Sequence, residues 1–411
     1  MDNKSPRYPM LSVEDVQERI LADTNAKESE IVSILDAEGR ILAENITADM
    51  NVPPWDNSAM DGFAVQAVDI ETAGPSSPVI LRVIADLPAG TAPECSVGSG
   101  EAIRIMTGAP VPPGADTVVR FEDTRSDKDS VEILKAVTRG KNVRLAGEDV
   151  QQGDMVLRAG MSLRPQEVGM LAVAGRQSVS VIQRPAVALL ATGDEVVDAG
   201  EPVPPGKIRN INSYTNAAQV RKAGGIPMML GIVPDDAERI RGAIRHAIAD
   251  GADILVTSGG VSVGDYDFVK QILAEEGEVE FWWINMKPGK PMAFGRIGGI
   301  PFFGLPGNPV SAMISFELFV RPAIEKMLGR EPQRSRFVRA RLLDPIARKD
   351  NRRHYLRVKL TSVEGGWEAR LTGSQGSGIL SSLVEADGLA VIPENTSSLE
   401  SGTEVEVLWL D

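Results

Sequence analysis

The segment DILVTSGGVSVGDYDFVKQILAEEG, residues 253–277, decides the fold. An apolar run ends in a glycine-rich turn and a helical pattern follows, which is typical of a strand–turn–helix unit. Three further segments repeat this order: AVALLATGDE (186–195), MMLGIVPDDAERIRGAIRHAIADG (228–251) and FFGLPGNPVSAMISFELFVRPAIEKMLG (302–329). Residues 185–329 are therefore expected to form an α/β domain with a mainly parallel sheet, and ligands bind such sheets at the carboxyl ends of the strands.

Short β-like runs lie on both sides of this region. Residues 41–149 contain ILAENITA, VILRVIAD, AIRIM and TVVRFED between clusters of glycine and proline, which predicts an inserted, mostly antiparallel β domain. Residues 330–411 contain RFVRARLL, HYLRVKL, WEARL, LAVIP and TEVEVLWL, which predict a small C-terminal barrel or sandwich.

The remaining segments favour helix. Ser12 precedes VEDVQERILA with acidic residues in the first turn, as an N-cap does, and the first 35 residues are expected to be helical. A short helix is expected after Pro165. Residues 1–40 and 150–184 together are interpreted as an elongated helical linking domain.

The composition excludes several kinds of site and partner. The 411 residues include 43 Lys+Arg and 57 Asp+Glu, and a net charge of -14 argues against a nucleic acid or anionic membrane as partner. The single cysteine, Cys95, excludes an internal disulfide, and two histidines, His246 and His354, exclude a histidine-rich metal centre. The single cysteine fits a reducing compartment, and a cytoplasmic location is expected. The N-terminus lacks the apolar core of a signal peptide, and no run is long enough to span a membrane.

The glycine-rich turn after residue 257 carries groups suited to an anion and a metal ion. Gly259 and Gly260 allow close backbone approach, and the amides at the start of the following helix favour negative charge. Ser262 adds a hydroxyl, and Asp265 and Asp267 can hold Mg²⁺ or activate water. The alternative is a capped tight turn with solvated aspartates.

The segment NMKPGKPMAFG, residues 285–295, places Lys287 and Lys290 on either side of a rigid Pro-Gly turn. Two ammonium groups held near each other suit an oxyanion and repel each other without one. The alternative is a surface turn with two solvated lysines.

Several weaker motifs also read as ordinary structure. Glu195 ends the strand of TGDE, Asp61 and Thr107 lie in glycine turns of SAMDGFAV and RIMTGAPVPPGAD, and Asn308 is a plausible cap before Pro309. In the tail, the alternating arginines of RRHYLR (352–357) are typical of charged positions on an edge strand.

In their order and spacing, these motifs resemble the MoeA family of molybdopterin molybdenumtransferases, whose eukaryotic counterparts include the gephyrin E domain. The likeness runs from SAMDGFAV through IMTGAP, GEDV, ATGDEVV, TSGGVSVGDYDFV, MKPGKP and FGLPGNPVSA to the arginine-rich tail strand. It implies an elongated helical segment, an inserted β domain, an α/β domain similar to molybdopterin adenylyltransferases and a C-terminal β-barrel. It also implies a homodimer whose cleft joins the α/β domain of one subunit to the β domains of the other.

The resemblance further implies insertion of molybdate into the dithiolene of adenylylated molybdopterin, with release of AMP and a requirement for Mg²⁺. The family motif has one arginine at this point of the tail strand, and the sequence leaves open whether Arg352 or Arg353 corresponds to it. The roles that it implies are catalytic for Asp267, Asp61, Glu195 and Thr107, molybdate or substrate binding for Ser262, Lys287, Lys290, Arg352, Ser377, Gly259 and Gly260, and metal binding for Asp149, Asp236 and Asp265.

Two other function classes stay open at this point. One is an adenylyltransferase that shares the α/β domain, although such an enzyme needs neither the KPGKP lysines nor the MDG and MTGAP turns. The other is a molybdopterin-binding scaffold, although the chain shows no long linker. Other proteins of cofactor biosynthesis are further candidate partners.

Overall fold

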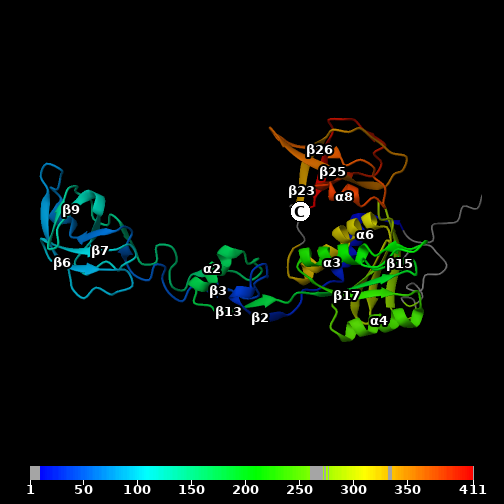
Figure 1. Ribbon diagram of the computed structural model, residues 1–411, viewed down its shortest axis with the longest axis horizontal. Coiled ribbons are helices and arrows are strands. Elements are labelled where there is room, and N and C mark those ends of the chain that lie inside the picture. Colours follow the sequence, from blue (N-terminus) through cyan, green and yellow to red (C-terminus); the bar gives the residue numbers. More distant parts are fainter. Residues whose placement is uncertain (1–9, 260–271, 273–274, 276, 332–335, 411) are drawn as a thin grey trace, which may run out of the picture. The chain divides into compact units, whose positions relative to one another are not determined.

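The structure is a computed structural model that describes residues 10–259, 272, 275, 277–331 and 336–410. The chain forms two compact units (Figure 1). The first unit comprises residues 1–30 and 182–411, and the second unit comprises residues 31–181. This division is coarser than the four expected domains, whose boundaries stay predictions.

A mixed seven-stranded sheet forms the centre of the α/β domain in the first unit. Its order is β1 (Met10–Leu11), β19 (Gly277–Ile284), β21 (Pro291–Ile297), β22 (Ile300–Leu305), β18 (Ile254–Ser258), β14 (Ala186–Thr192) and β17 (Ile226–Val233). The four strands from β22 to β17 are parallel, while β21 runs antiparallel to both β19 and β22. The expected mainly parallel sheet is thereby confirmed. No helix in the described ranges is long and apolar enough to cross a membrane.

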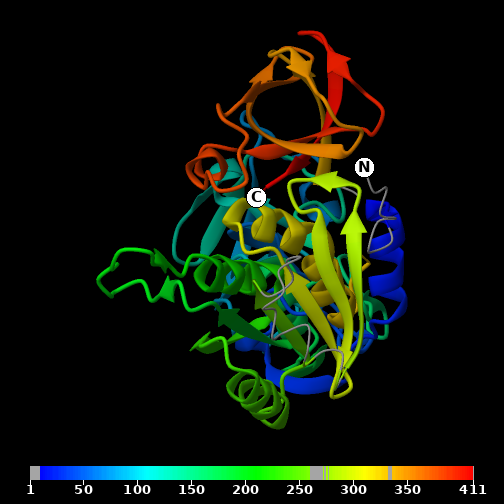
Figure 2. The ribbon, with the colours of Figure 1, turned by 90° about the vertical axis from the view of Figure 1, so that its right-hand side faces the viewer.

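Helices cover both faces of this sheet (Figures 1 and 2). One face carries α1 (Val13–Ala22), α3 (Asn212–Ala223) and a continuous helix made of α6 (Pro309–Ser315), the π-helical segment η4 (Phe316–Val320) and α7 (Arg321–Met327). On the other face, α4 (Ala237–Ala249) buries Ile240 and Ile244 against Ala188 and Leu190 of β14. These residues lie one helical turn apart on α4 and two apart on the strand, so each pair shares a face.

The N-terminal helix is shorter than the sequence suggests. The Ser12 hydroxyl accepts a hydrogen bond from the Asp15 amide at 3.0 Å, and the Asp15 carboxylate accepts one from the Ser12 amide at 3.2 Å, so the expected cap is confirmed. The expectation of helix throughout the first 35 residues is wrong, because α1 ends at Ala22 and Ser29–Ser33 forms strand β2. At that end the Asp23 carboxylate binds Arg296 at 2.9 Å.

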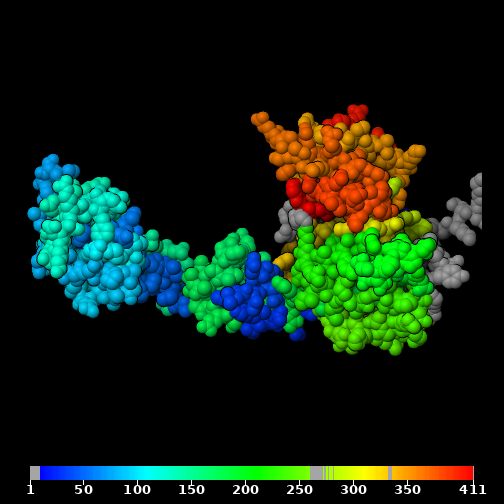
Figure 3. Space-filling view, viewed as in Figure 1, coloured from blue at the N-terminus to red at the C-terminus, as the bar shows by residue number. Residues whose placement is uncertain are grey.

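The C-terminal part of the first unit is a closed barrel of five strands. They are β23 (Phe337–Leu342), β25 (Arg353–Val363), β26 (Gly366–Leu371), β27 (Gly388–Ile392) and β29 (Glu404–Trp409), and β25 closes the barrel by pairing with both β26 and β27. All five expected strands are present, and closure excludes the sandwich. The barrel lies directly on the α/β domain (Figure 3), because β20 (Met286–Lys287) pairs in parallel with the start of β25.

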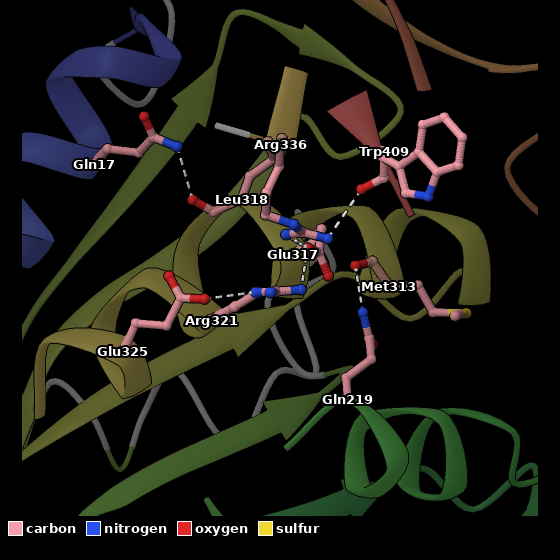
Figure 4. A network of polar contacts seen from close by, with 9 residues as sticks. All are labelled: Gln17, Gln219, Met313, Glu317, Leu318, Arg321, Glu325, Arg336 and Trp409. Atoms are coloured by element: carbon pink, nitrogen blue, oxygen red, sulfur yellow. Dashed lines mark hydrogen bonds and ion pairs between the residues drawn. The ribbon is translucent and has the colours of Figure 1, made fainter. Parts of the chain in front are cut away.

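A network of buried ion pairs also joins the barrel to the helical layer (Figure 4). The Glu317 side chain is 8% exposed, lies 3.1 Å from Arg321, and also binds Arg336. Arg321 reaches Glu325 at 2.8 Å, and Arg336 donates a hydrogen bond to the Trp409 carbonyl at 2.9 Å. One carboxylate on η4 thereby fixes the point at which the chain enters and leaves the barrel.

The second unit contains a six-stranded sheet, several two-stranded pairings and an α-helix. The sheet order is β8 (Thr117–Arg120), β5 (Gly62–Val65), β7 (Glu101–Ile105), β6 (Val79–Leu87), β10 (Ser130–Ile133) and β9 (Thr124–Ser126). Since β6–β7 is its one parallel pairing, the expected mostly antiparallel domain is confirmed. Helix α2 (Pro165–Val173) begins at Pro165 as expected.

Candidate functional site

Three glycine-containing turns meet at the carboxyl edge of the parallel strands. Gly259 follows β18 with a φ of +96°, and its amide donates to the Leu305 carbonyl of β22 at 3.1 Å. A Cβ built on Gly259 would lie 3.5 Å from the Thr192 carbonyl of β14, and one on Gly307 would lie 3.9 Å from the Gly259 Cα. The turns after β14, β18 and β22 therefore lie together at the edge where sheets of this kind bind ligands. Gly260, Ser262, Asp265 and Asp267 lie outside the described residues, and their roles stay predictions.

Acidic side chains gather beside the turn that follows β14. The Asp235 amide donates to the Asp194 carboxylate at 3.4 Å. Burial raises the pKa of Asp235, and the nearby charges of Asp194 and Glu195 raise it further. Asp236, in contrast, caps α4 by accepting a hydrogen bond from the Arg239 amide at 2.9 Å. The sequence therefore placed Glu195 correctly at this edge but did not identify Asp194 and Asp235 as its neighbours.

These carboxylates do not form a complete metal site. Within the ranges that the structure describes, no group of three or more His, Cys, Asp or Glu side chains is close enough to hold a metal ion.

The turn MKPGKP requires glycine at its centre. Gly289 has a φ of +107°, and a Cβ there would lie 2.8 Å from the Met286 side chain and 2.9 Å from the Ser315 hydroxyl. The two lysines of the turn engage different partners. The Lys287 ammonium lies 3.5 Å from the Asp350 carboxylate, whereas the Lys290 ammonium lies 3.6 Å from the centroid of the Trp283 ring, in a cation–π contact.

Asp350 connects the lysine turn to the arginine-rich strand of the barrel. Its Oδ2 accepts a hydrogen bond from Arg352 Nη2 at 3.1 Å, and its Oδ1 lies 2.8 Å from His354 Nε2. Burial opposes ionisation of Asp350, but the hydrogen bonds from His354 and Arg352 outweigh it, and the pKa of the carboxyl falls well below its usual range. Asp350 carries no motif in the sequence that pointed to it. Asp350 and Arg352 lie in bends before β25 begins at Arg353, so the alternation of a strand does not reach Asp350, and no periodic pattern in the sequence predicts its contacts.

The same strand separates the two candidate arginines. Arg352 lies beside Asp350 and hence beside Lys287. Arg353 points to the other face, where it pairs with Glu394 at 3.2 Å and with Glu14 of α1. The register that the sequence left open therefore favours Arg352 as the arginine next to the lysine turn.

A cavity of about 290 Å³ lies where this turn meets the barrel. Lys287, Arg348 and His354 line its polar side, and Pro288, Ile346 and Leu356 are among its apolar lining. The Arg348 guanidinium donates to the carbonyls of Thr396, Arg352 and Pro393, so its hydrogen bonds leave its charge unneutralised. The cavity therefore has a cationic wall.

The loop that carries Ser377 is wrapped around a buried arginine. Arg357 is fully buried, and its Nη2 donates to the carbonyls of Ser374 at 3.2 Å and Gly376 at 3.0 Å. The Ser377 carbonyl in turn accepts a hydrogen bond from the Val310 amide of α6 at 3.2 Å. The interpretation of Arg357 as a charged edge-strand position is wrong, because β25 lies inside a closed barrel and has no free edge.

In the second unit, Asp61 and Thr107 lie together. Asp61 Oδ1 accepts hydrogen bonds from both the amide and the hydroxyl of Thr107, each at 2.7 Å. These two bonds lower the pKa of the Asp61 carboxyl. Asp149 is exposed on a neighbouring loop, and its amide donates to the Val52 carbonyl at 3.0 Å. The structure thus brings together two turns that the sequence suggested only separately, and their proposed roles stay predictions.

Three family models match consecutive parts of the chain. Residues 11–175 match the MoeA N-terminal region (domain I and II), residues 188–326 match a probable molybdopterin binding domain, and residues 332–410 match the MoeA C-terminal region (domain IV).

Known proteins show the same similarity over nearly the whole chain. A molybdopterin molybdenumtransferase of Nostoc sp. is 39% identical over 98% of this chain and 95% of its own. The molybdopterin molybdenumtransferase of Bacillus subtilis is 36% identical over 97% of this chain and 94% of its own. A crystal structure of the molybdopterin biosynthesis MoeA protein from Pyrococcus horikoshii superposes with a TM-score of 0.81, at 33% identity, over 98% of this chain and all of that one.

Proposed function

Because the chain belongs to the MoeA family of molybdopterin molybdenumtransferases, and is therefore a transferase, we propose that it inserts molybdate into the dithiolene of adenylylated molybdopterin. The proposal includes release of AMP and dependence on Mg²⁺. The observation that carries it is the meeting of Lys287 and Arg352 at one carboxylate, Asp350, where the α/β domain joins the barrel.

These two cations suit a tetrahedral dianion. Arg352 offers five N–H donors in a planar fork and Lys287 offers three, so Asp350 engages only part of what they supply. The remaining donors can bind a second anion. Lys290, Ser262 and Ser377 are proposed as further ligands of molybdate, and the Ser377 carbonyl is held against α6 by the Val310 amide.

The carboxylates of the proposal have different environments. Asp61 is held ionised by Thr107, which suits a group that accepts a hydrogen bond from substrate or holds an ion better than a proton donor. Glu195 lies exposed at the sheet edge and is proposed to act on the substrate there. Asp267 keeps its proposed catalytic role through the resemblance alone.

The acidic group at the sheet edge fits Mg²⁺ in its chemistry. Mg²⁺ prefers oxygen ligands and is commonly bound through one or two carboxylates together with substrate phosphates, so a complete protein cage is not required. Burial is the main reason why the pKa of Asp235 is raised, and the neighbouring charges of Asp194 and Glu195 raise it further, so a cation would be favoured beside these three carboxylates. Bound there, the ion would neutralise charge on the pyrophosphate of the substrate. Asp149 and Asp265 remain proposed ligands, whereas Asp236 is already engaged as a helix cap.

The family resemblance also supports a homodimer in the cytoplasm, with other proteins of cofactor biosynthesis as partners. These points belong to the proposal and depend on the resemblance.

The proposal is tested by incubating the purified protein with adenylylated molybdopterin, sodium molybdate and Mg²⁺. AMP release should require both molybdate and Mg²⁺, and removal of Mg²⁺ with a chelator should stop it. Full AMP release without molybdate, or none at all, would contradict the proposal. ATP consumption with pyrophosphate release would point to an adenylyltransferase instead.

A further inference from the structure

The proposed oxyanion site contains an anion of its own. Asp350 Oδ2 lies 3.1 Å from Arg352 Nη2 and 3.5 Å from Lys287 Nζ. Within the described part of the chain, Asp350 is the one carboxylate that contacts either cation. It reaches the lysine across the junction of two domains, since Lys287 belongs to β20 and Arg352 precedes β25.

We propose that Asp350 is a resident counter-ion that holds Lys287 and Arg352 in place while the site is empty and competes with the incoming oxyanion for them. Asp350 thereby sets how tightly the site holds molybdate. This inference rests on the proposed function, because it concerns the same two cations.

The contacts explain both parts of this role. Without Asp350 the ammonium and the guanidinium would repel each other, and both side chains would be free to turn toward solvent, since the Lys287 side chain is 49% exposed and that of Arg352 is 28% exposed. The carboxylate orients the two cations and at the same time neutralises part of their positive charge. An oxyanion that enters meets two attractive charges and one repulsive charge.

A moderate affinity suits the proposed reaction. Binding that is equally strong in the ground state and the transition state lowers the KM without raising kcat, and molybdate has to leave its protein ligands for the dithiolene. A carboxylate that competes for the same donors weakens the ground state and leaves Arg352 pre-oriented. Asp350 is also a weak base, because His354 and Arg352 lower the pKa of its carboxyl, so a positioning role fits it better than proton transfer.

The test is a calorimetric titration of sodium molybdate into the wild-type protein and Asp350→Asn. The substitution keeps the shape of the side chain and removes its charge, and we expect molybdate to bind about three- to tenfold tighter. The KM for molybdate should fall by a similar factor while kcat does not rise. The gain should shrink at high salt, because partly exposed charges are screened; a purely structural effect would not depend on salt in this way.

Asp344→Asn is the matched control. Asp344 lies in the same barrel, its side chain is 31% exposed against 30% for Asp350, and it accepts a hydrogen bond from the Leu371 amide at 2.8 Å. Its nearest cation, Arg370, lies at 3.9 Å and belongs to neither the lysine turn nor RRHYLR. Molybdate affinity should be unchanged in this variant.

Equal or weaker binding by Asp350→Asn, with wild-type binding intact, would overturn the counter-ion role and leave the proposed function standing. No molybdate binding by either protein would overturn both. If thermal unfolding shows that Asp350→Asn does not fold, Asp350→Ser carries the same measurement, since it removes the charge, keeps an oxygen that can accept a hydrogen bond, and should also bind molybdate more tightly than wild type does.

Discussion

Lys287→Ala should raise the molybdate concentration that supports half-maximal activity by roughly 10- to 150-fold, because a charge-assisted contact is worth about 1.5–3 kcal/mol. The side chain is half exposed, so the substitution should leave the fold intact. The measurement is a titration of AMP release against molybdate at saturating adenylylated pterin. High molybdate should partly rescue the variant, and the affinity for the pterin should change little.

Lys349→Ala is the control for this titration. Lys349 is exposed, adjoins Asp350 in the sequence and has the same charge as Lys287. Within the described residues, no contact links its side chain to Lys287, Asp350 or Arg352. Its curve should overlay that of the wild type. Overlapping curves for Lys287→Ala and wild type would instead make Lys287 a solvated surface residue. The same titration on Lys290→Ala decides whether Lys290 leaves Trp283 to reach the oxyanion.

Glu317→Ala should lower the free energy of unfolding by about 3–5 kcal/mol, because it removes the buried carboxylate that two arginines share. In this variant Arg321 keeps its ion pair with Glu325, but Arg336 loses its ion pair with η4. The barrel thereby loses part of its attachment to the helical layer (Figure 4). Chemical denaturation followed by circular dichroism measures the change.

The exposed pair Arg339–Glu404 provides the comparison within the same unit. Its side chains are 76% and 65% exposed, so Glu404→Ala should cost at most about 1 kcal/mol. Equal losses in the two variants would show that burial of Glu317 does not determine its contribution.

Local patterns were enough to predict most of the framework. The four strand–turn units, the five barrel strands and the Ser12 cap each depend on residues close together in the sequence, where periodicity and turn chemistry act. The same holds for Gly259 and Gly289, whose left-handed backbone belongs to the turns that their motifs suggested. The end of α1 at Ala22 was missed, because the Arg296 that binds Asp23 lies on a distant strand.

The site itself depends on contacts that no local pattern contains. Asp350 meets Lys287 because β20 pairs in parallel with β25, and the register of that pairing is set by the packing of two domains. The alternation of residues in RRHYLR made Arg357 look like a surface position, because it contains no information about the loop of Ser374 and Gly376 that covers this side chain. Long-range packing therefore decides which of the candidate cations share a site and which have purely structural partners.

If Lys287 and Arg352 form one oxyanion site, substitutions of the two neighbouring arginines Arg352 and Arg353 should have different effects on molybdate binding. Molybdate binding should be measured by calorimetry for Arg352→Ala and Arg353→Ala. The account predicts that Arg352→Ala binds molybdate roughly 10- to 150-fold more weakly. Arg353→Ala should keep wild-type affinity, because its side chain contacts Glu14, Glu394 and Tyr355 and not the lysine turn, and it should be less stable. Wild-type affinity in Arg352→Ala, with the loss in Arg353→Ala instead, would contradict the account.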